Sequence, residues 1–166
     1  MVAIVSKVEL LSPACRAEID AWLAKYPVDQ RRSAVIPALH VVQDANNGYL
    51  TDELTEAVAD YLQIPRIWAF EVATFYSMYE QKPVGRHKIG VCCSICCQLR
   101  GAKELSEHLK QKLGIGFGET TDDGKFTLKH VECLGACVDA PVLQLGKEYH
   151  AKVTPEKVDT LLEKLP

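Results

Sequence analysis

The sequence predicts a fold of the α/β (α+β) class, with a helical N-terminal half followed by a mixed half of strands and helices. Two observations lead to this prediction. Apolar residues recur at helical spacing up to Phe75, whereas short strand-like runs interrupted by turns begin at His87. The change falls at the turn-type stretch Lys82-Pro83-Val84-Gly85. We therefore expect two domains, residues 1–85 and residues 86–166, and the 166-residue chain is long enough for both.

Four helices are predicted in the N-terminal half. Ser12-Pro13 provides an N-cap and a first-turn proline for the first helix. A second begins near Ser33 and stops at Asn46-Asn47-Gly48, a third starts at Thr51, and a fourth opens at Pro65. Their apolar positions follow helical spacing: Ile19, Trp22, Leu23 and Tyr26; Val35, Ile36, Leu39 and Val42; Leu54, Val58, Tyr61 and Leu62; Ile67, Phe70 and Phe75.

The C-terminal half is predicted to begin with a strand over His87 to Cys92. An amphipathic helix ending at Gly114 follows, with Leu99, Ala102, Leu105, Leu109 and Leu113 on one face. The remaining elements are a strand from Phe126 to Val131, two short strands around residues 142–145 and 149–153, and a last helix that Thr154-Pro155 caps.

Composition and charge exclude several classes of function. The formal net charge is −3, without the basic excess that a nucleic-acid-binding face needs, so no nucleic acid partner is expected. No apolar run approaches the roughly 20 residues that span a bilayer, so no direct membrane insertion is expected. The apolar start at residues 1–5 is too short for the core of a signal peptide. We expect a cytosolic chain.

The seven cysteines are the most informative residues of the sequence. An odd number in a chain without an export signal does not suit a disulfide framework. Six of the seven fall in two groups, Cys92-Cys93-Ser94-Ile95-Cys96-Cys97 and Cys133-Leu134-Gly135-Ala136-Cys137, each in a loop after a predicted strand. This distribution is typical of metal ligands or redox thiols, whereas the isolated Cys15 on the first helix is expected to pack in the core.

Spacing alone permits three arrangements of these thiols. Cys92-x4-Cys97 with Cys133-x3-Cys137 suits an iron–sulfur cluster. The inner pair Cys93-x2-Cys96, together with Cys133 and Cys137, has the spacing of a structural zinc site. Without the second pair, Cys93-x2-Cys96 resembles the motif of a redox dithiol. Because side chains alternate along a strand, Cys93 shares a face with the apolar Ile89 and Val91 while Cys92 points away. Alternation therefore favours Cys92 as the ligand. Cys93 and Cys96 are expected to pack, because free cysteine is among the most buried residue types.

No catalytic constellation is found beside the cysteines. The sequence contains no Ser-His-Asp order, phosphate-binding glycine loop or dinucleotide fingerprint, so no catalytic residue is assigned. The histidines form no ligand-spaced pair and are expected at the surface or in packing: His40, His87, His108, His130 and His150.

Several of these motifs resemble one known family. They are Gly85-Arg86-His87, Cys92-x4-Cys97 leading to Leu99-x-Gly101, Thr121-x-Asp123-Gly124-Lys125-Phe126, the second cysteine group and Ala140-Pro141, with Ala38-Leu39-His40-x-Val42-Gln43, Ile64-Pro65 and residues 71–77 upstream. Together they are similar to the thioredoxin-like [2Fe-2S] subunit of NADH:quinone oxidoreductase (respiratory complex I), also called the 24-kilodalton family. The resemblance runs from about Arg31 to Leu165.

The resemblance implies a thioredoxin-like ferredoxin domain after an N-terminal helical bundle. It implies one [2Fe-2S] cluster held by Cys92, Cys97, Cys133 and Cys137. In the family, an adjoining flavoprotein subunit binds FMN and NADH and exchanges one electron at a time with this cluster. The isolated chain is therefore expected to oxidise no NADH. The complex would hold the chain at the cytoplasmic membrane, or on the matrix side in an organelle.

Other features of the sequence extend or qualify this expectation. Cys93 and Cys96 stand where the family usually has other residues. The alternatives are an equivalent subunit of an NAD-linked hydrogenase or formate dehydrogenase, a zinc-stapled adaptor, and a dithiol oxidoreductase. Six side chains carry further expectations: Arg86, Lys88 and Arg100 as cations near the cluster, and Trp68, Tyr76 and Tyr79 as candidates for the partner-binding surface of the helical half.

Overall fold

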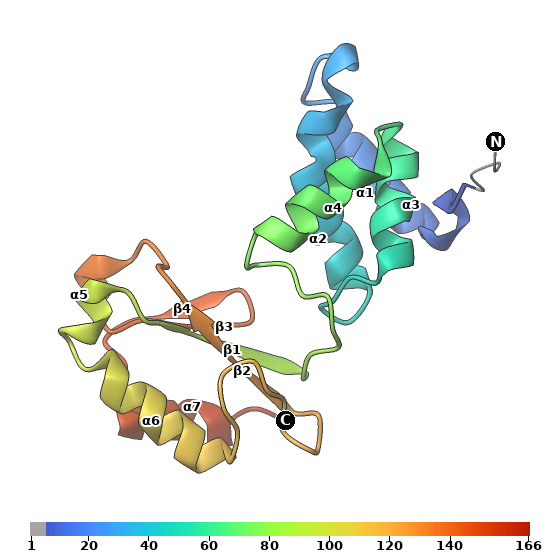
Figure 1. Cartoon of the computed structure of the whole chain (residues 1–166). Helices are drawn as coiled ribbons and strands as arrows, with labels where there is room; N and C mark the ends of the chain where they lie inside the picture. The colour runs from blue at the N-terminus through green and yellow to red at the C-terminus, as the bar shows by residue number, and fades with distance from the viewer. Residues whose placement is uncertain (1–5) are drawn as a thin grey trace. The chain divides into compact units, whose positions relative to one another are not determined.

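The computed structural model describes residues 6–166, which form two compact units (Figure 1). The first unit ends at Pro83 and the second runs from Val84 to Pro166. The domain boundary between residues 85 and 86 stays a prediction. The apolar start at residues 1–5, and the expectation built on it, lie outside the described residues.

The N-terminal unit is helical, as the sequence predicts. Its four α-helices are α1 (Pro13–Leu23), α2 (Val35–Ala45), α3 (Asp52–Leu62) and α4 (Arg66–Phe75), and two 3-10 helices, η1 (Val8–Leu10) and η2 (Val28–Ala34), precede α1 and α2. The predicted caps are present: the Ser12 side chain accepts from the Cys15 N–H, and Thr51 accepts from the Leu54 N–H. Pro37 lies in the first turn of α2, where a missing N–H removes no helical hydrogen bond.

The core of this unit lies between the helices. It combines residues from all four, among them Ile19, Leu39, Val58 and Ala69, all fully buried. Ile36, expected on the apolar face of α2, is instead exposed. Small residues dominate the buried side of α4, which consists of Ala69 and Ala73. This leaves the larger apolar side chains of α4, such as Ile67, at the surface.

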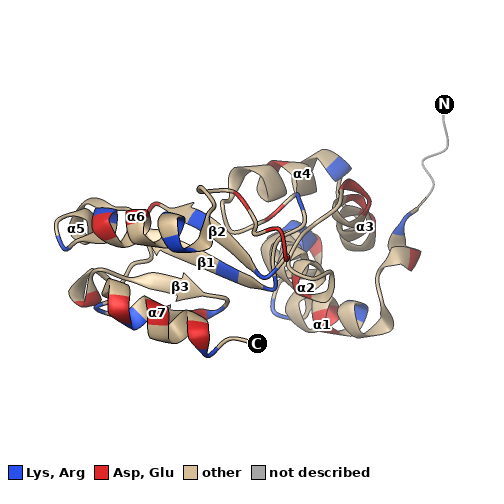
Figure 2. Ribbon diagram, turned by 90° about the horizontal axis from the view of Figure 1, so that it is seen from below, with Lys and Arg blue, Asp and Glu red and all other residues tan. Residues whose placement is uncertain are grey.

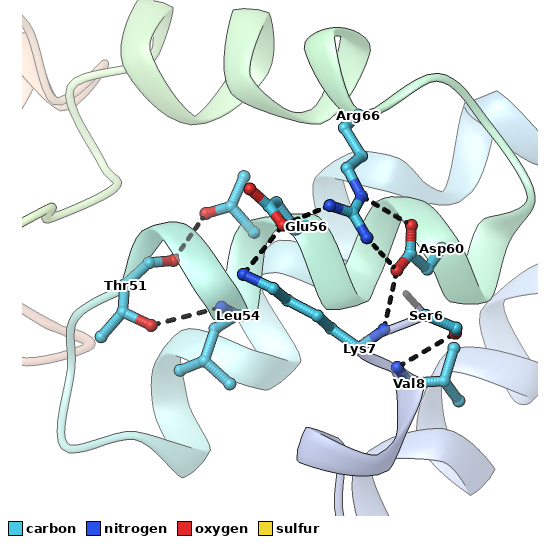
Figure 3. A network of polar contacts seen from close by, with 9 residues as sticks. Ser6, Lys7, Val8, Thr51, Leu54, Glu56, Asp60 and Arg66 are labelled. Atoms are coloured by element: carbon cyan, nitrogen blue, oxygen red, sulfur yellow. Dashed lines mark hydrogen bonds and ion pairs between the residues drawn. The ribbon is translucent and has the colours of Figure 1, made fainter. Parts of the chain in front are cut away.

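A group of ion pairs ties the start of the described chain to α3 and α4 (Figure 3). The Arg66 guanidinium pairs with Glu56 and with Asp60, whose oxygen lies 2.8 Å from Arg66 Nη2. The Lys7 ammonium lies 2.9 Å from Glu56, and its backbone N–H donates to Asp60 at 2.8 Å. Both cations and both carboxylates are at least two-thirds buried, so these contacts are shielded from solvent.

The C-terminal unit contains a four-stranded sheet in the order β2-β1-β3-β4. Strands β1 (His87–Cys92) and β2 (Phe126–Val131) have the predicted bounds and pair in parallel, with His87 opposite Phe126. Strands β3 (Leu143–Leu145) and β4 (Glu148–His150) add antiparallel neighbours. The last strand is shorter than predicted, because Lys152 takes a left-handed conformation just beyond it.

Helices α6 (Ala102–Leu113) and α7 (Pro155–Glu163) pack beside one another against the sheet (Figure 1). Their apolar faces form one core with alternate residues of the strands, including Ile89, Val91 and Leu128. Acidic and basic residues are interspersed along both helices (Figure 2). This mixed charge is typical of a solvated helix face.

The structure corrects the predicted helix that carries Leu99. A separate short helix, α5 (Ile95–Gln98), comes first, and Gly101 at φ 98° separates it from α6. Leu99 therefore lies between the helices and is 79% exposed rather than packed. A left-handed residue interrupts the helical period, so apolar residues on its two sides do not share a face.

Among residues 6–166, no helix has the length and apolar character needed to cross a membrane.

Candidate metal centre

The two cysteine groups meet at one edge of the sheet because β1 and β2 are parallel. Cys92 is the last residue of β1, opposite Val131 at the end of β2. The chain that leaves β1 enters α5, and the chain that leaves β2 carries Cys133 and the 3-10 helix η3 (Cys137–Asp139). Both groups thus follow strands, as predicted, and neighbouring parallel strands bring them together.

Two of the predicted ligands are buried and two are exposed. Cys92 is 2% exposed and Cys97 is 1% exposed, and they pack with Ala102 and Ala140 in a small apolar cluster. Cys133 and Cys137 are exposed. The site therefore has a dry side formed by the first loop and a solvent-facing side formed by the second.

The four predicted ligands are connected through side-chain contacts. Burial raises the pKa of the Cys97 thiol to about 11, and a hydrogen bond and charge repulsion from Cys92 add to this, with a smaller effect from Cys137. The pKa of Cys137 is also raised, first by a hydrogen bond with Cys96 and less by a hydrogen bond with Cys133. The thiols of the first and second cysteine groups thus influence one another, which agrees with their position after adjacent strands.

Backbone N–H groups point at these sulfurs. The Val142 N–H hydrogen-bonds the Cys97 sulfur, which lowers the pKa of that thiol and partly opposes the effect of burial. The Gly135 N–H donates to Cys133 Sγ at 3.4 Å. Gly135 has a φ of 71°, a conformation that glycine adopts without strain. Such donors stabilise negative charge on sulfur and are typical of iron–sulfur sites.

The donor set suits a [2Fe-2S] cluster, which four cysteine thiolates hold. Within residues 6–166, no three metal-binding side chains are arranged to hold a single ion. A binuclear cluster would take two thiolates on each iron, and the four cysteines are enough for this.

Cys93 and Cys96 have opposite environments. Cys93 packs against the core that contains Ile89 and Val91, as the strand alternation predicts. Its pKa is raised by burial, and its sulfur lies 3.4 Å from the Val91 carbonyl oxygen. Cys96 was expected to pack as well, but this is wrong: it is exposed on α5. The sequence contains no signal for this, because α5 was not predicted.

The structure also corrects the cations expected near the cysteines. Arg86 precedes the first residue of β1 and donates its N–H to Gly124, whereas Cys92 ends the strand. At about 3.3 Å per residue, Arg86 lies roughly 20 Å along the chain from Cys92. Lys88 lies two residues closer, and Arg100 is the second residue after α5 and is exposed. Of the three, Arg100 alone lies beside the cysteine loops.

The aromatic candidates for a partner surface differ in exposure. Tyr79 is a wrong candidate, because its ring is buried and its hydroxyl donates to the Ile36 carbonyl at 2.8 Å. Tyr76 is exposed, and so is Phe75 beside it, which was not singled out. Trp68 is half-buried and lies under the Arg32 guanidinium, 4.3 Å from the ring centre.

Comparison with known proteins agrees with the motifs. The family model described as thioredoxin-like [2Fe-2S] ferredoxin matches residues 19–166. A subunit of the NADH-quinone oxidoreductase of Rickettsia bellii is 46% identical over 143 residues, covering 86% of this chain and 86% of the relative. An NADH-quinone oxidoreductase subunit of Rhizobium meliloti is 46% identical over 148 residues, covering 89% of this chain and 86% of the relative.

Among solved structures, an NAD+-reducing [NiFe]-hydrogenase in the air-oxidized state has a similar fold, with a TM-score of 0.65. The identity is 21%, and the match covers 78% of this chain and 22% of the hydrogenase chain. This likeness concerns the fold alone.

Proposed function

Since this chain belongs to the thioredoxin-like [2Fe-2S] ferredoxin family, we propose that it is the one-electron-transfer iron–sulfur subunit of an NADH:quinone oxidoreductase. The observation that carries the proposal is the position of the two cysteine groups, which follow adjacent parallel strands and therefore lie at the same end of the sheet. The names of relatives at 46% identity favour the quinone-linked complex. The hydrogenase likeness, at 21% identity, does not argue for the alternative.

Cys92, Cys97, Cys133 and Cys137 are the proposed ligands. A [2Fe-2S] cluster held there would take up and release one electron at a time. The Val142 and Gly135 N–H groups would favour the added negative charge, and the burial of Cys92 and Cys97 would oppose it. The chain itself thus sets how readily the centre is reduced.

NADH gives up two electrons as a hydride, so a one-electron centre needs a flavin between the two. The sequence has no dinucleotide fingerprint, and we assign the binding of NADH and FMN to an adjoining flavoprotein subunit. That partnership would hold the chain at the membrane, on the cytoplasmic side in a bacterium.

The proposal is tested by reducing the anaerobically purified chain in two ways. Dithionite is expected to bleach its visible absorption and produce an EPR signal of one unpaired electron per chain. NADH is expected to do neither until the flavoprotein subunit with FMN is added.

Reduction of the chain by NADH without the flavoprotein would contradict the assignment of NADH and FMN binding to that subunit. A colourless protein that contains zinc would support the zinc-stapled adaptor instead, and a metal-free protein that reduces insulin disulfides would support the dithiol enzyme.

A further inference from the structure

Three apolar side chains are exposed on the two loops that carry the cysteines. Ile95 begins α5, Leu99 follows this helix directly, and Val138 lies in η3; they are 68%, 79% and 92% exposed. Ile95 and Leu99 are four residues apart, and the Leu99 N–H donates to the Ile95 carbonyl at 3.0 Å, so both lie on one side of the helical turn. Cys97 stands between them in the sequence and is buried on the other side.

Contacts between the two loops bring these side chains to one end of the sheet. Cys97 of α5 packs in one apolar cluster with Ala140, which directly follows η3, and with Leu134 of the second loop. The Cys92 sulfur lies 3.8 Å from the Glu132 carbonyl oxygen, which connects the end of β1 to the start of the second loop. Figure 1 shows the orange segment after β2 beside α5. The exposed apolar side chains of both loops therefore lie at the same end of the sheet.

Neither loop carries a charged residue beside these side chains. Residues 92–99 and residues 133–138 are all uncharged, and the nearest charges in the sequence are Arg100, Glu132 and Asp139 at the ends of the loops. A surface that attracts a diffusing redox carrier needs charge of one sign around the contact. The centre of a permanent subunit interface is instead apolar and depleted of charged residues. The charge distribution therefore fits a permanent subunit as the partner.

The size of this surface argues against a second copy of the chain as the occupant. Three side chains expose only a few hundred Å² of apolar area, which is the size of a patch that marks an interaction site. A stable dimer needs about 800 Å² from each protomer. The surface therefore fits the apolar centre of a larger interface, to which a different and larger subunit contributes the rest.

We propose that the loop surface, formed by Ile95, Leu99 and Val138, docks onto an apolar face of the flavoprotein subunit. The inference rests on the proposed function for the identity of this partner. Cys133 and Cys137 are exposed, whereas the other two proposed ligands are buried, so a redox partner comes closest to the site from the side of the second loop. Val138 directly follows Cys137 on that side. Docking there covers both exposed cysteines and removes water from around them.

The test measures the affinity of the full, iron-loaded chain for the FMN-containing flavoprotein subunit. Val138→Glu and Leu99→Glu are each expected to weaken binding at least about tenfold, because the interface would bury a carboxylate without a partner. Val28→Glu is the matched control and should bind like the wild type. Val28 is the same residue type as Val138 and is 89% exposed, but it lies in η2 of the N-terminal unit, next to the charged Asp29.

Two further measurements separate docking from other effects. Iron content and the dithionite-reduced EPR spectrum are compared with the wild type, because Val138 is next to a proposed ligand. If Val138→Glu loads less iron, Leu99→Glu on the other loop decides the result. Val138→Lys is expected to weaken binding as much as Val138→Glu, and added salt should change the wild-type affinity little, since the contact is apolar. Tighter binding by either charge variant would overturn the inference.

The remaining outcomes separate the docking surface from the proposed function. If NADH reduces the wild type through the flavoprotein, but Val138→Glu and Leu99→Glu bind as tightly as Val28→Glu, the docking surface fails and the proposed function stands. A dimer of the isolated chain that Val138→Glu disrupts would assign the surface to a second copy and would also overturn the inference. If the iron-loaded wild type neither binds the flavoprotein nor accepts electrons through it, the proposed function fails as well.

Discussion

Cys92 and Cys93 are adjacent in the sequence but lie on opposite faces of β1. Cys92 packs with Cys97 under the cysteine loops, and Cys93 packs against the core below the sheet. Strand alternation predicts this difference, because it depends only on the two-residue period of a strand. The exposure of Cys96 could not be predicted in the same way, since it depends on a four-residue helix and on the loop that faces it. Local periodicity does not encode such contacts between loops.

Serine substitutions separate the two roles. We expect Cys92→Ser and Cys97→Ser to lose the cluster or to shift its visible and EPR spectra, because a hydroxyl is a much weaker iron ligand than a thiolate. Cys93→Ser is the matched control, of the same residue type one position away, and its spectra should stay nearly unchanged. The measurements are iron per chain and the reduced-state EPR spectrum. Loss of iron from Cys93→Ser would show that the ligand had been assigned to the wrong cysteine.

At the scale of elements, the sequence predicts the bounds of a helix best where a capping residue marks its first turn. Ser12, Thr51 and Thr154 each accept a backbone N–H at the start of a helix, and the side-chain oxygen preceding a helical pattern makes all three recognisable. The helix α5 and the short bounds of β4 were not predictable, because they are too brief to show a period. Leu99 was wrongly predicted to lie on the apolar face of α6, because the left-handed backbone of Gly101 interrupts the helix between them.

Gly85 tests how the chain enters β1. Its N–H donates to the buried Thr127 hydroxyl at 2.6 Å, and an added Cβ would lie 2.8 Å from the Phe126 backbone. Gly85→Ala is therefore expected to push the chain off β2 and destabilise the C-terminal unit by about 1–3 kcal/mol. Hydrogen exchange in peptides covering β1 and β2 is the measurement. Gly116→Ala is the control, because its Cβ would meet only the flexible Glu119 carboxylate. Unchanged exchange in Gly85→Ala would refute the close contact.

Asp60 tests the ion pairs between α3 and α4. The hydrogen bond from Arg66 lowers the pKa of Asp60 below its ordinary value, although burial partly opposes this. A lowered folded-state pKa means that the ionised carboxylate stabilises the fold above a pH of about 4, and that this stabilisation is lost as the pH falls through the lowered pKa. Asp60→Asn should therefore cost about 2 kcal/mol at neutral pH and progressively less in acid.

Both tryptophans, Trp22 and Trp68, lie in the N-terminal unit, so fluorescence during urea unfolding reports the stability of this unit. Glu71→Gln is the control for Asp60→Asn: its pair with Arg32 is 3.5 Å long and about half exposed, so the change should cost less than about 0.5 kcal/mol. Equal costs for the two variants, or a cost of Asp60→Asn that persists in acid, would contradict this interpretation.

At the scale of the whole chain, the two units divide the sequence by chemistry as well as by fold. All six clustered cysteines lie in the second unit, and the first contributes only the buried Cys15, as predicted. Periodicity and turn signals were sufficient to predict the helical and mixed halves, and the resemblance of the motifs to a known family identified the family. They did not predict that the proposed site has one buried and one exposed pair of ligands, because burial depends on how the two loops pack at the sheet edge.

The most direct test of the account is the content of the chain after anaerobic purification. Iron, acid-labile sulfide and zinc are measured on the same sample, together with the EPR spectrum after reduction. We predict about two irons and two sulfides per chain, little zinc, and a reduced signal of one unpaired electron, as a single [2Fe-2S] centre requires. A full complement of cysteines with neither iron nor sulfide, or with stoichiometric zinc in their place, would contradict the central claim.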